Sequence, residues 1–131
     1  MQYQYFIASS SRNSESITEL TQKIREKNKS VYSFLETNPL TKLIGEEISV
    51  ENWRDDPRTK LIFEKNIHPL KNSKALILLL PAGKSAHIES GIAYGMGKKC
   101  ILIGDPGETD SLYLIFNEVY TSVDDFIKSL K

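Results

Sequence analysis

The apolar run ALILLL at Ala75–Leu80 constrains the fold more than any other part of the sequence. A continuous apolar run without alternation is typical of a strand that is covered on both faces, as in a parallel sheet. A second such strand, KCILIG, follows at Lys99–Gly104, and the aromatic and branched segment QYQYFIA at Gln2–Ala8 predicts an earlier one. Because a sheet covered on both faces needs helices on each side, we expect strands and helices to alternate.

The segments between these strands carry helical signals. Ile17, Leu20 and Ile24 recur at helical spacing and predict an amphipathic helix that ends near Lys29. This helix has a plausible cap at Asn13 or Ser14, and a strand at Val31–Leu35 and an irregular loop around Pro39 and Gly45 are expected after it. One or two short helices are expected at Pro57–His68, and a further helix is capped by Ser85 and stops at Gly97. The last elements are a strand or short helical piece at Ser111–Phe116 and a closing helix capped by Ser122. This order predicts a single doubly wound α/β domain over residues 1–131. Its sheet should be mostly parallel, with about five strands, in a flavodoxin-like or Rossmann-like arrangement.

The charge and cysteine content exclude several classes of partner. Seventeen basic and seventeen acidic residues cancel, so no overall field attracts nucleic acid or an anionic membrane. The apolar runs are far shorter than the roughly 20 residues of a membrane-spanning helix. The single cysteine, Cys100, cannot form an internal disulfide, and the first residues lack the apolar stretch of a secretory signal. We therefore expect a cytoplasmic protein that binds a small molecule.

A Gly-Lys-Ser sequence at Gly83–Ser85 directly follows the central apolar run, as it does in a phosphate-binding loop of nucleotide hydrolases. The full motif needs another glycine five positions before Gly83, so that consecutive backbone N–H groups surround a phosphate. That position holds Leu78. The segment is therefore not such a loop.

Polar residues follow two of the predicted strands, as ASSSRN and as PAGKSAHIE. Ligands of doubly wound sheets bind beyond the carboxyl ends of the strands. If Ser85 caps the next helix, Glu89 lies one turn inside it and faces the ligand crevice. Glu89 does not fit a capping box, since the third residue after Ser85 is Ile88, but complementing the helix dipole remains an alternative.

Glycines recur at Gly91, Gly95 and Gly97 in this helix. Each internal one costs about 1 kcal/mol relative to alanine. We expect this cost to reflect close approach of the helix to the sheet or to a ligand.

The segment LLLPAGKSAHIESGIAYGMGKKCILI, together with YFIASSSRN and VYSF, resembles the nucleoside 2-deoxyribosyltransferase-like superfamily, which includes nucleotide N-glycosidases. The resemblance covers Tyr5–Ile103 and is strongest over Glu89–Lys98. It implies that Glu89 is a nucleophile, which attacks the anomeric carbon to form a glycosyl-enzyme ester that water or a second base resolves. We expect the helix N-terminus to keep Glu89 ionised by lowering its pKa.

The same resemblance implies that the first loop holds a 5'-phosphate. Three hydroxyls and Arg12 before a helix N-terminus suit an anion, although a polar surface loop with a helix cap is the alternative. Trp53 is expected either to stack on a base or to anchor the core. The expected substrate-binding residues are Ala8, Ser9, Ser10, Ser11, Arg12, Trp53, Gly83 and Ser85, with help from Lys84.

The chain departs from the family pattern where the leaving base needs a proton. The aspartate that relatives carry before the third strand falls near Asn66, and an amide donates no titratable proton. Glu64 or His68 would take its place, His68 because its ordinary pKa lies near neutrality, unless it is only a histidine at a helix end. A second aspartate, six residues before the nucleophile, is Gly83 here. The role of His87, which should point away from Glu89, is left open.

These observations predict an N-glycosidase or (deoxy)ribosyltransferase that acts on a nucleotide or nucleoside, with hydrolysis favoured over base exchange. The alternatives are an NAD-cleaving enzyme similar to TIR domains and a nucleotide sensor without catalysis. We expect no metal and no cofactor. Because relatives complete their sites with residues of a neighbouring subunit, the resemblance implies a homodimer or a higher homo-oligomer.

Overall fold

The computed structural model describes residues 2–37 and 52–131. The described strands form one sheet in the order β2-β1-β3-β4-β5, and every pair is parallel. The strands are β1 (Tyr3–Ala8), β2 (Val31–Tyr32), β3 (Ser73–Leu79), β4 (Lys99–Ile103) and β5 (Glu118–Tyr120). This order confirms the predicted flavodoxin-like sheet.

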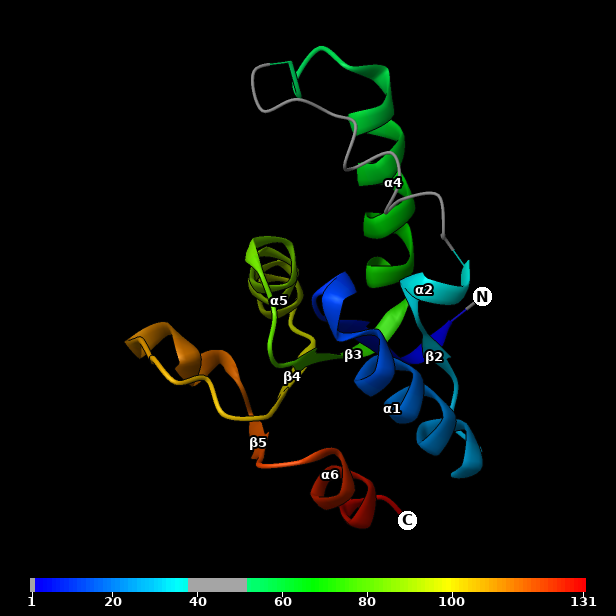
Figure 1. Cartoon of the computed structure of the whole chain (residues 1–131), viewed down its shortest axis with the longest axis vertical. Helices are drawn as coiled ribbons and strands as arrows, with labels where there is room; N and C mark the ends of the chain where they lie inside the picture. Colours follow the sequence, from blue (N-terminus) through cyan, green and yellow to red (C-terminus); the bar gives the residue numbers. More distant parts are fainter. Residues whose placement is uncertain (1, 38–51) are drawn as a thin grey trace.

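Helices cover both faces of the sheet (Figure 1). The helical elements are η1 (Ser11–Asn13), α1 (Ser14–Glu26), α2 (Phe34–Thr37), α4 (Pro57–Lys71), α5 (Lys84–Gly95), η2 (Ser111–Ile115) and α6 (Val123–Ser129), where η marks a 3₁₀ turn. Helices α1 and α6 lie on one side of the sheet, and α4 and α5 lie on the other. The doubly wound arrangement is therefore as predicted.

The two faces of the sheet have separate apolar cores. On one face, Ile17, Leu20 and Ile24 of α1 are fully buried beside Phe126 of α6, which confirms the helical spacing read from the sequence. On the other face, Leu70 of α4 and the small side chains of α5 pack on the strands. Cys100 is fully buried in β4, as expected for a small apolar residue.

Several predicted elements differ from the structure. The strand expected at Val31–Leu35 ends at Tyr32, and α2 begins two residues later. Of the two alternatives for Ser111–Phe116, the short helical piece is confirmed and the strand is wrong. The segment is mostly the 3₁₀ turn η2, which the Asp110 side chain caps by accepting a hydrogen bond from the Leu112 N–H. The fifth strand is β5, which follows that turn. The loop expected around Pro39 and Gly45 lies outside the described residues.

Helix α5 begins two residues earlier than a cap at Ser85 would place it. Gly83 is its N-cap, so Ser85 is the second helical residue and caps nothing. The stop at Gly97 is confirmed by its left-handed φ of 76°. A Cβ at Gly91 or Gly95 would meet no atom within 4 Å, so the expected close approach of these glycines to the sheet is wrong. The side chains that face the sheet from α5 are those of Ala86, Ser90 and Ala93, all of them buried.

The remaining helices agree more closely with the sequence pattern. One continuous helix, α4, replaces the one or two short helices expected at Pro57–His68. The closing helix α6 is capped as predicted, since the Ser122 hydroxyl accepts a hydrogen bond from the Asp125 N–H at 3.1 Å. No helix in the described part of the chain is long and apolar enough to span a bilayer.

Candidate active site

The sheet reverses its winding between β1 and β3. These strands are neighbours, and the chain leaves β1 towards α1 on one face and β3 towards α5 on the other. Ala8 pairs with Leu78, so the loops after both strands lie at the same edge of the sheet. In doubly wound folds this edge at the point of reversal is where ligands bind.

Hydrogen bonds join the two loops at this edge. The Ser9 hydroxyl donates to the Leu79 carbonyl at 2.7 Å. The Asn13 amide donates to the Ser9 hydroxyl at 3.2 Å and to the Leu80 carbonyl at 3.4 Å. The polar segments that follow β1 and β3 are therefore held together as one surface.

The loop after β1 also carries exposed polar groups. The Ser10 hydroxyl accepts a hydrogen bond from the Arg12 N–H at 3.2 Å and so caps η1. The Arg12 side chain is exposed, and its guanidinium forms no ion pair with another residue of the described ranges. Ala8 is buried in the core, so it can offer a ligand only its backbone. Lys84 and Ser85 are exposed at the first turn of α5.

Glu89 lies in the second turn of α5, and its side chain is partly buried. Its carboxyl group makes no hydrogen bond or ion pair with any other residue that the structure describes. Burial raises its pKa from 4.5 to about 8. The expectation of a lowered pKa is therefore wrong, because the helix dipole acts within the first turn and Glu89 lies beyond it.

The rotation of α5 fixes the direction that Glu89 faces. Successive helical residues are turned by about 100°, so His87 and Glu89 lie about 200° apart, on opposite flanks of the helix. His87 Nε2 lies 2.9 Å from the Tyr113 hydroxyl in η2, which follows β4. Glu89 therefore lies on the other flank of α5, which faces β1 and α4. Both of these elements contact α5. This is the side on which the loop after β1 lies.

The structure does not bring His68 to this edge within one chain. His68 lies in the last turn of α4, where the side chain of Asn72 donates to its backbone carbonyl at 2.8 Å. The next strand, β3, starts at Ser73, so this turn lies at the amino edge of the sheet, opposite Glu89. Asn66 lies two residues before His68 on the same helix. The His68 side chain is therefore not placed to protonate a base held beside Glu89 of its own chain.

Trp53 lies before the start of α4, whose N-terminal end projects away from the strands (Figure 1). It is 49% exposed, and the Arg54 guanidinium lies 5.3 Å from its ring centroid. The alternative that it anchors the core is therefore wrong. No group of three histidine, cysteine, aspartate or glutamate side chains that could hold a metal occurs in the described ranges.

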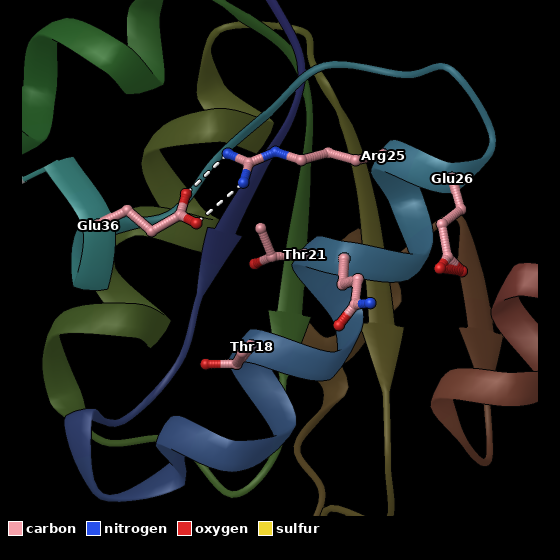
Figure 2. A pocket seen from close by; sticks show the side chains of 6 residues that line it. Thr18, Thr21, Arg25, Glu26 and Glu36 are labelled. Atoms are coloured by element: carbon pink, nitrogen blue, oxygen red, sulfur yellow. Dashed lines mark hydrogen bonds and ion pairs between the residues drawn. The ribbon is translucent and has the colours of Figure 1, made fainter.

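A hollow of about 450 Å³ lies between α1 and α2 (Figure 2). Its lining includes no residue of the loops that follow β1 and β3. Arg25 and Glu36 form a two-point ion pair across it, with N–O distances of 2.7 and 2.9 Å. The guanidinium holds the pKa of the Glu36 carboxyl below its usual range. The other residues that line the hollow are Thr18, Thr21, Gln22 and Glu26. It contains none of the predicted site residues, and its ion pair fastens α2 to α1.

Sequence reasoning missed two contributors to this edge. Asn13 was expected only as a helix cap, but its side chain makes no capping bond and instead joins the two loops. Tyr113 gave no signal, because only the folded chain brings it to His87. His87 does point away from Glu89, as its helical spacing predicted.

Solved structures of two enzymes share this architecture. One is a 2-deoxyribosyltransferase from the psychrotolerant bacterium Bacillus psychrosaccharolyticus, with a TM-score of 0.70 and 16% identity over 94% of this chain and 89% of the other. The second is a CMP N-glycosidase from Clostridium botulinum, with a TM-score of 0.58 and 19% identity over 96% of this chain and 95% of the other. No family model matches the sequence, and no curated protein is significantly similar to it. The chain has the fold of the nucleoside 2-deoxyribosyltransferase-like superfamily, as the resemblance implied.

Proposed function

We propose that this protein is an N-glycosidase that hydrolyses a nucleoside monophosphate, with Glu89 as the nucleophile. The observation that carries the proposal is a partly buried carboxyl group without a partner in the described chain, at the edge where β1 and β3 diverge. The activities named for the two structural neighbours, transfer of a 2-deoxyribosyl group and cleavage of CMP, support the same class of substrate. Hydrolysis is favoured over base exchange because Gly83 stands where many transferases carry an aspartate.

In the proposed reaction the loop after β1 binds the phosphate. Ser10, Ser11 and the guanidinium of Arg12, which has no ion-pair partner among residues 2–37 and 52–131, supply donors at a helix N-terminus, which suits an anion. Gly83 and Ser85, at the start of α5, complete this polar surface. The sugar then lies between the phosphate loop and Glu89.

The ionised Glu89 attacks the C1' carbon as the glycosidic bond breaks. The base leaves with the electron pair of that bond and takes a proton from solvent. Water then attacks C1', gives up a proton to solvent, and breaks the ester bond, which releases the Glu89 carboxylate. A developing positive charge on the sugar is stabilised by a carboxylate with little competing solvent. Because burial raises the pKa of Glu89 to about 8, only a minority of free enzyme carries this charge at neutral pH.

We also propose that the protein works as a cytoplasmic homodimer through the outer faces of α4 and α5. Ile88 of α5 is 64% exposed, and Leu61 and Phe63, on opposite flanks of α4, are 45% and 59% exposed, so each flank of α4 offers one apolar side chain. Gly91 and Gly95 leave open space above α5, which would let a second helix approach closely. A second copy would also bring its own side chains to an edge that His68 of the same chain does not reach. Light scattering after size-exclusion chromatography tests this assembly, and a monomer at micromolar concentration would contradict it.

The proposed activity is tested by incubating the protein with nucleoside monophosphates, free nucleosides and NAD, and separating the products by chromatography. We expect free base from a monophosphate and none from the Glu89→Ala variant. Release of nicotinamide from NAD would instead favour the NAD-cleaving alternative. Binding of nucleotides without any cleavage would favour a sensor, and an alanine variant that cleaves as fast as the wild type would refute the assignment of Glu89.

A further inference from the structure

The imidazole of His87 bridges two loops at the carboxyl edge of the sheet. Its Nδ1 lies 2.8 Å from the Gly83 carbonyl oxygen, and its Nε2 lies 2.9 Å from the Tyr113 hydroxyl. A carbonyl oxygen can only accept a hydrogen bond, so Nδ1 carries the hydrogen. Nε2 of the neutral ring then accepts from the Tyr113 hydroxyl. The bridge therefore has one defined direction, from Tyr113 through His87 to the start of α5.

Tyr113 is itself held firmly relative to the sheet. Its N–H donates to the Asp110 carbonyl at 2.9 Å, within the turn that the Asp110 side chain caps. Its ring packs edge-on against Phe116, with centroids 5.6 Å apart, and Phe116 is buried in the core. The Tyr113 hydroxyl is thus a fixed point from which the adjacent helix can be positioned.

Helix α5 packs on the sheet through the small side chains of Ala86, Ser90 and Ala93, all of them buried. The partly buried side chain of Ile92 packs against the same core. The N-cap of α5, Gly83, provides no side-chain hydrogen bond. A bond to the His87 flank therefore constrains the direction of the opposite flank, which carries Glu89.

We propose that the hydrogen bond from Tyr113 to His87 is a positioning contact, which fixes the rotation of α5 and thereby aims the Glu89 carboxyl at the bound sugar. His87 and Tyr113 act through Glu89 and do not touch the reacting atoms. This inference rests on the proposed role of Glu89. It assigns a function to two residues that the proposed reaction does not otherwise use.

The test is the Tyr113→Phe variant, which removes one hydroxyl and keeps the ring that packs on Phe116. We expect kcat for the cleaved nucleotide to fall about 10-fold or more while KM changes less than about two-fold, because misalignment affects attack more than binding. The carboxyl carbon resonance of Glu89, assigned by its loss in Glu89→Gln, should titrate at a lower pH than in the wild type. A helix free to turn exposes this carboxyl to water.

The matched control is Tyr94→Phe, which removes from an exposed tyrosine of α5 a hydroxyl that makes no hydrogen bond within the described ranges. Glu89 should titrate in this variant as in the wild type. His87→Gln offers a carbonyl oxygen near the position of Nε2, so it should retain most of the activity that His87→Ala loses. The double variant of His87→Ala and Tyr113→Phe should be no worse than the stronger single one.

The positioning contact is refuted if Glu89 titrates at the same pH in Tyr113→Phe as in the Tyr94→Phe control and the two variants have the same kcat. It is also refuted if the losses of His87→Ala and Tyr113→Phe add. The titration of Glu89 needs no substrate, so it decides the matter even if the wild type cleaves no nucleotide. A failure of the proposed function is therefore distinguishable from a failure of this inference.

Discussion

Replacing Glu89 by glutamine should stabilise the protein, and the gain should grow as the pH rises. The ordinary pKa of this carboxyl group is 4.5, and burial raises it to about 8 in the folded chain. Between these values the unfolded chain releases its proton and the folded chain keeps it, so the wild type loses stability as the pH increases. A glutamine has a similar shape and no charge to bury, and therefore avoids this loss.

The size of the effect follows from the two pKa values. Each pKa unit corresponds to about 1.4 kcal/mol, so the displacement from 4.5 to about 8 sets an upper limit of about 5 kcal/mol above pH 8. At pH 5 less than about 1 kcal/mol of this cost is present, because this pH lies only half a unit above the ordinary pKa of the group. The advantage of Glu89→Gln should therefore be about 4 kcal/mol larger at pH 9 than at pH 5.

Urea unfolding followed by circular dichroism at pH 5, 7 and 9 measures this difference as a change in the free energy of unfolding. Glu108→Gln is the matched control, since Glu108 is exposed and its replacement removes only a solvated charge. The free energy of unfolding of this control should change with pH as that of the wild type does. If Glu89→Gln also follows the wild type, the carboxyl is solvated in the folded chain, and the geometry assigned to the site is incorrect.

The phosphate loop, the nucleophile and the sheet edge each give one further test. Arg12→Ala should raise KM for a nucleoside monophosphate about 10-fold or more and leave KM for the free nucleoside unchanged, because the guanidinium is proposed to contact only the phosphate; initial rates on both substrates check this. The value of kcat/KM should rise with pH and level off above about 8, since only ionised Glu89 attacks, and a profile that is flat through this range would contradict the mechanism. Gly104→Ala should lower the free energy of unfolding by about 1 to 3 kcal/mol, because φ is 115° and the new Cβ would lie 3.0 Å from Leu80 Cβ. Thermal unfolding measures this loss, and Gly91→Ala, with open space and ordinary helical geometry, should lose nothing.

Much of the fold could be predicted because its signals are local. The spacing of Ile17, Leu20 and Ile24 specifies one buried helical face wherever that helix packs. The apolar run that became β3 is buried on both faces, as its composition required. Polar residues after two strands of a predicted parallel sheet were enough to put the candidate site at the carboxyl edge of the sheet, where ligands of doubly wound folds bind.

The errors arose where tertiary contacts outweigh the local pattern. Strand β5 has only three residues, and it is extended because it pairs with β4. A local sequence pattern cannot predict this pairing. The apolar residues Leu112 and Leu114 left a strand and a short helical piece as alternatives, and in the structure both side chains are exposed in the turn that Asp110 caps. A short apolar segment does not reveal whether its side chains face a core or solvent.

The sign of the Glu89 pKa change illustrates the same limit at the site, and it bears on function. Sequence position placed Glu89 near a helix N-terminus, where the backbone dipole favours the charged form. The folded chain starts the helix two residues earlier and so puts Glu89 in the second turn, where burial dominates and favours the neutral form. A carboxylate that is costly to ionise in the free protein is more strongly stabilised when a cationic sugar forms beside it, because little solvent competes for either charge. The burial that lowers stability at high pH is therefore the feature that would make Glu89 an effective nucleophile, and the stability and kinetic experiments probe a single cause.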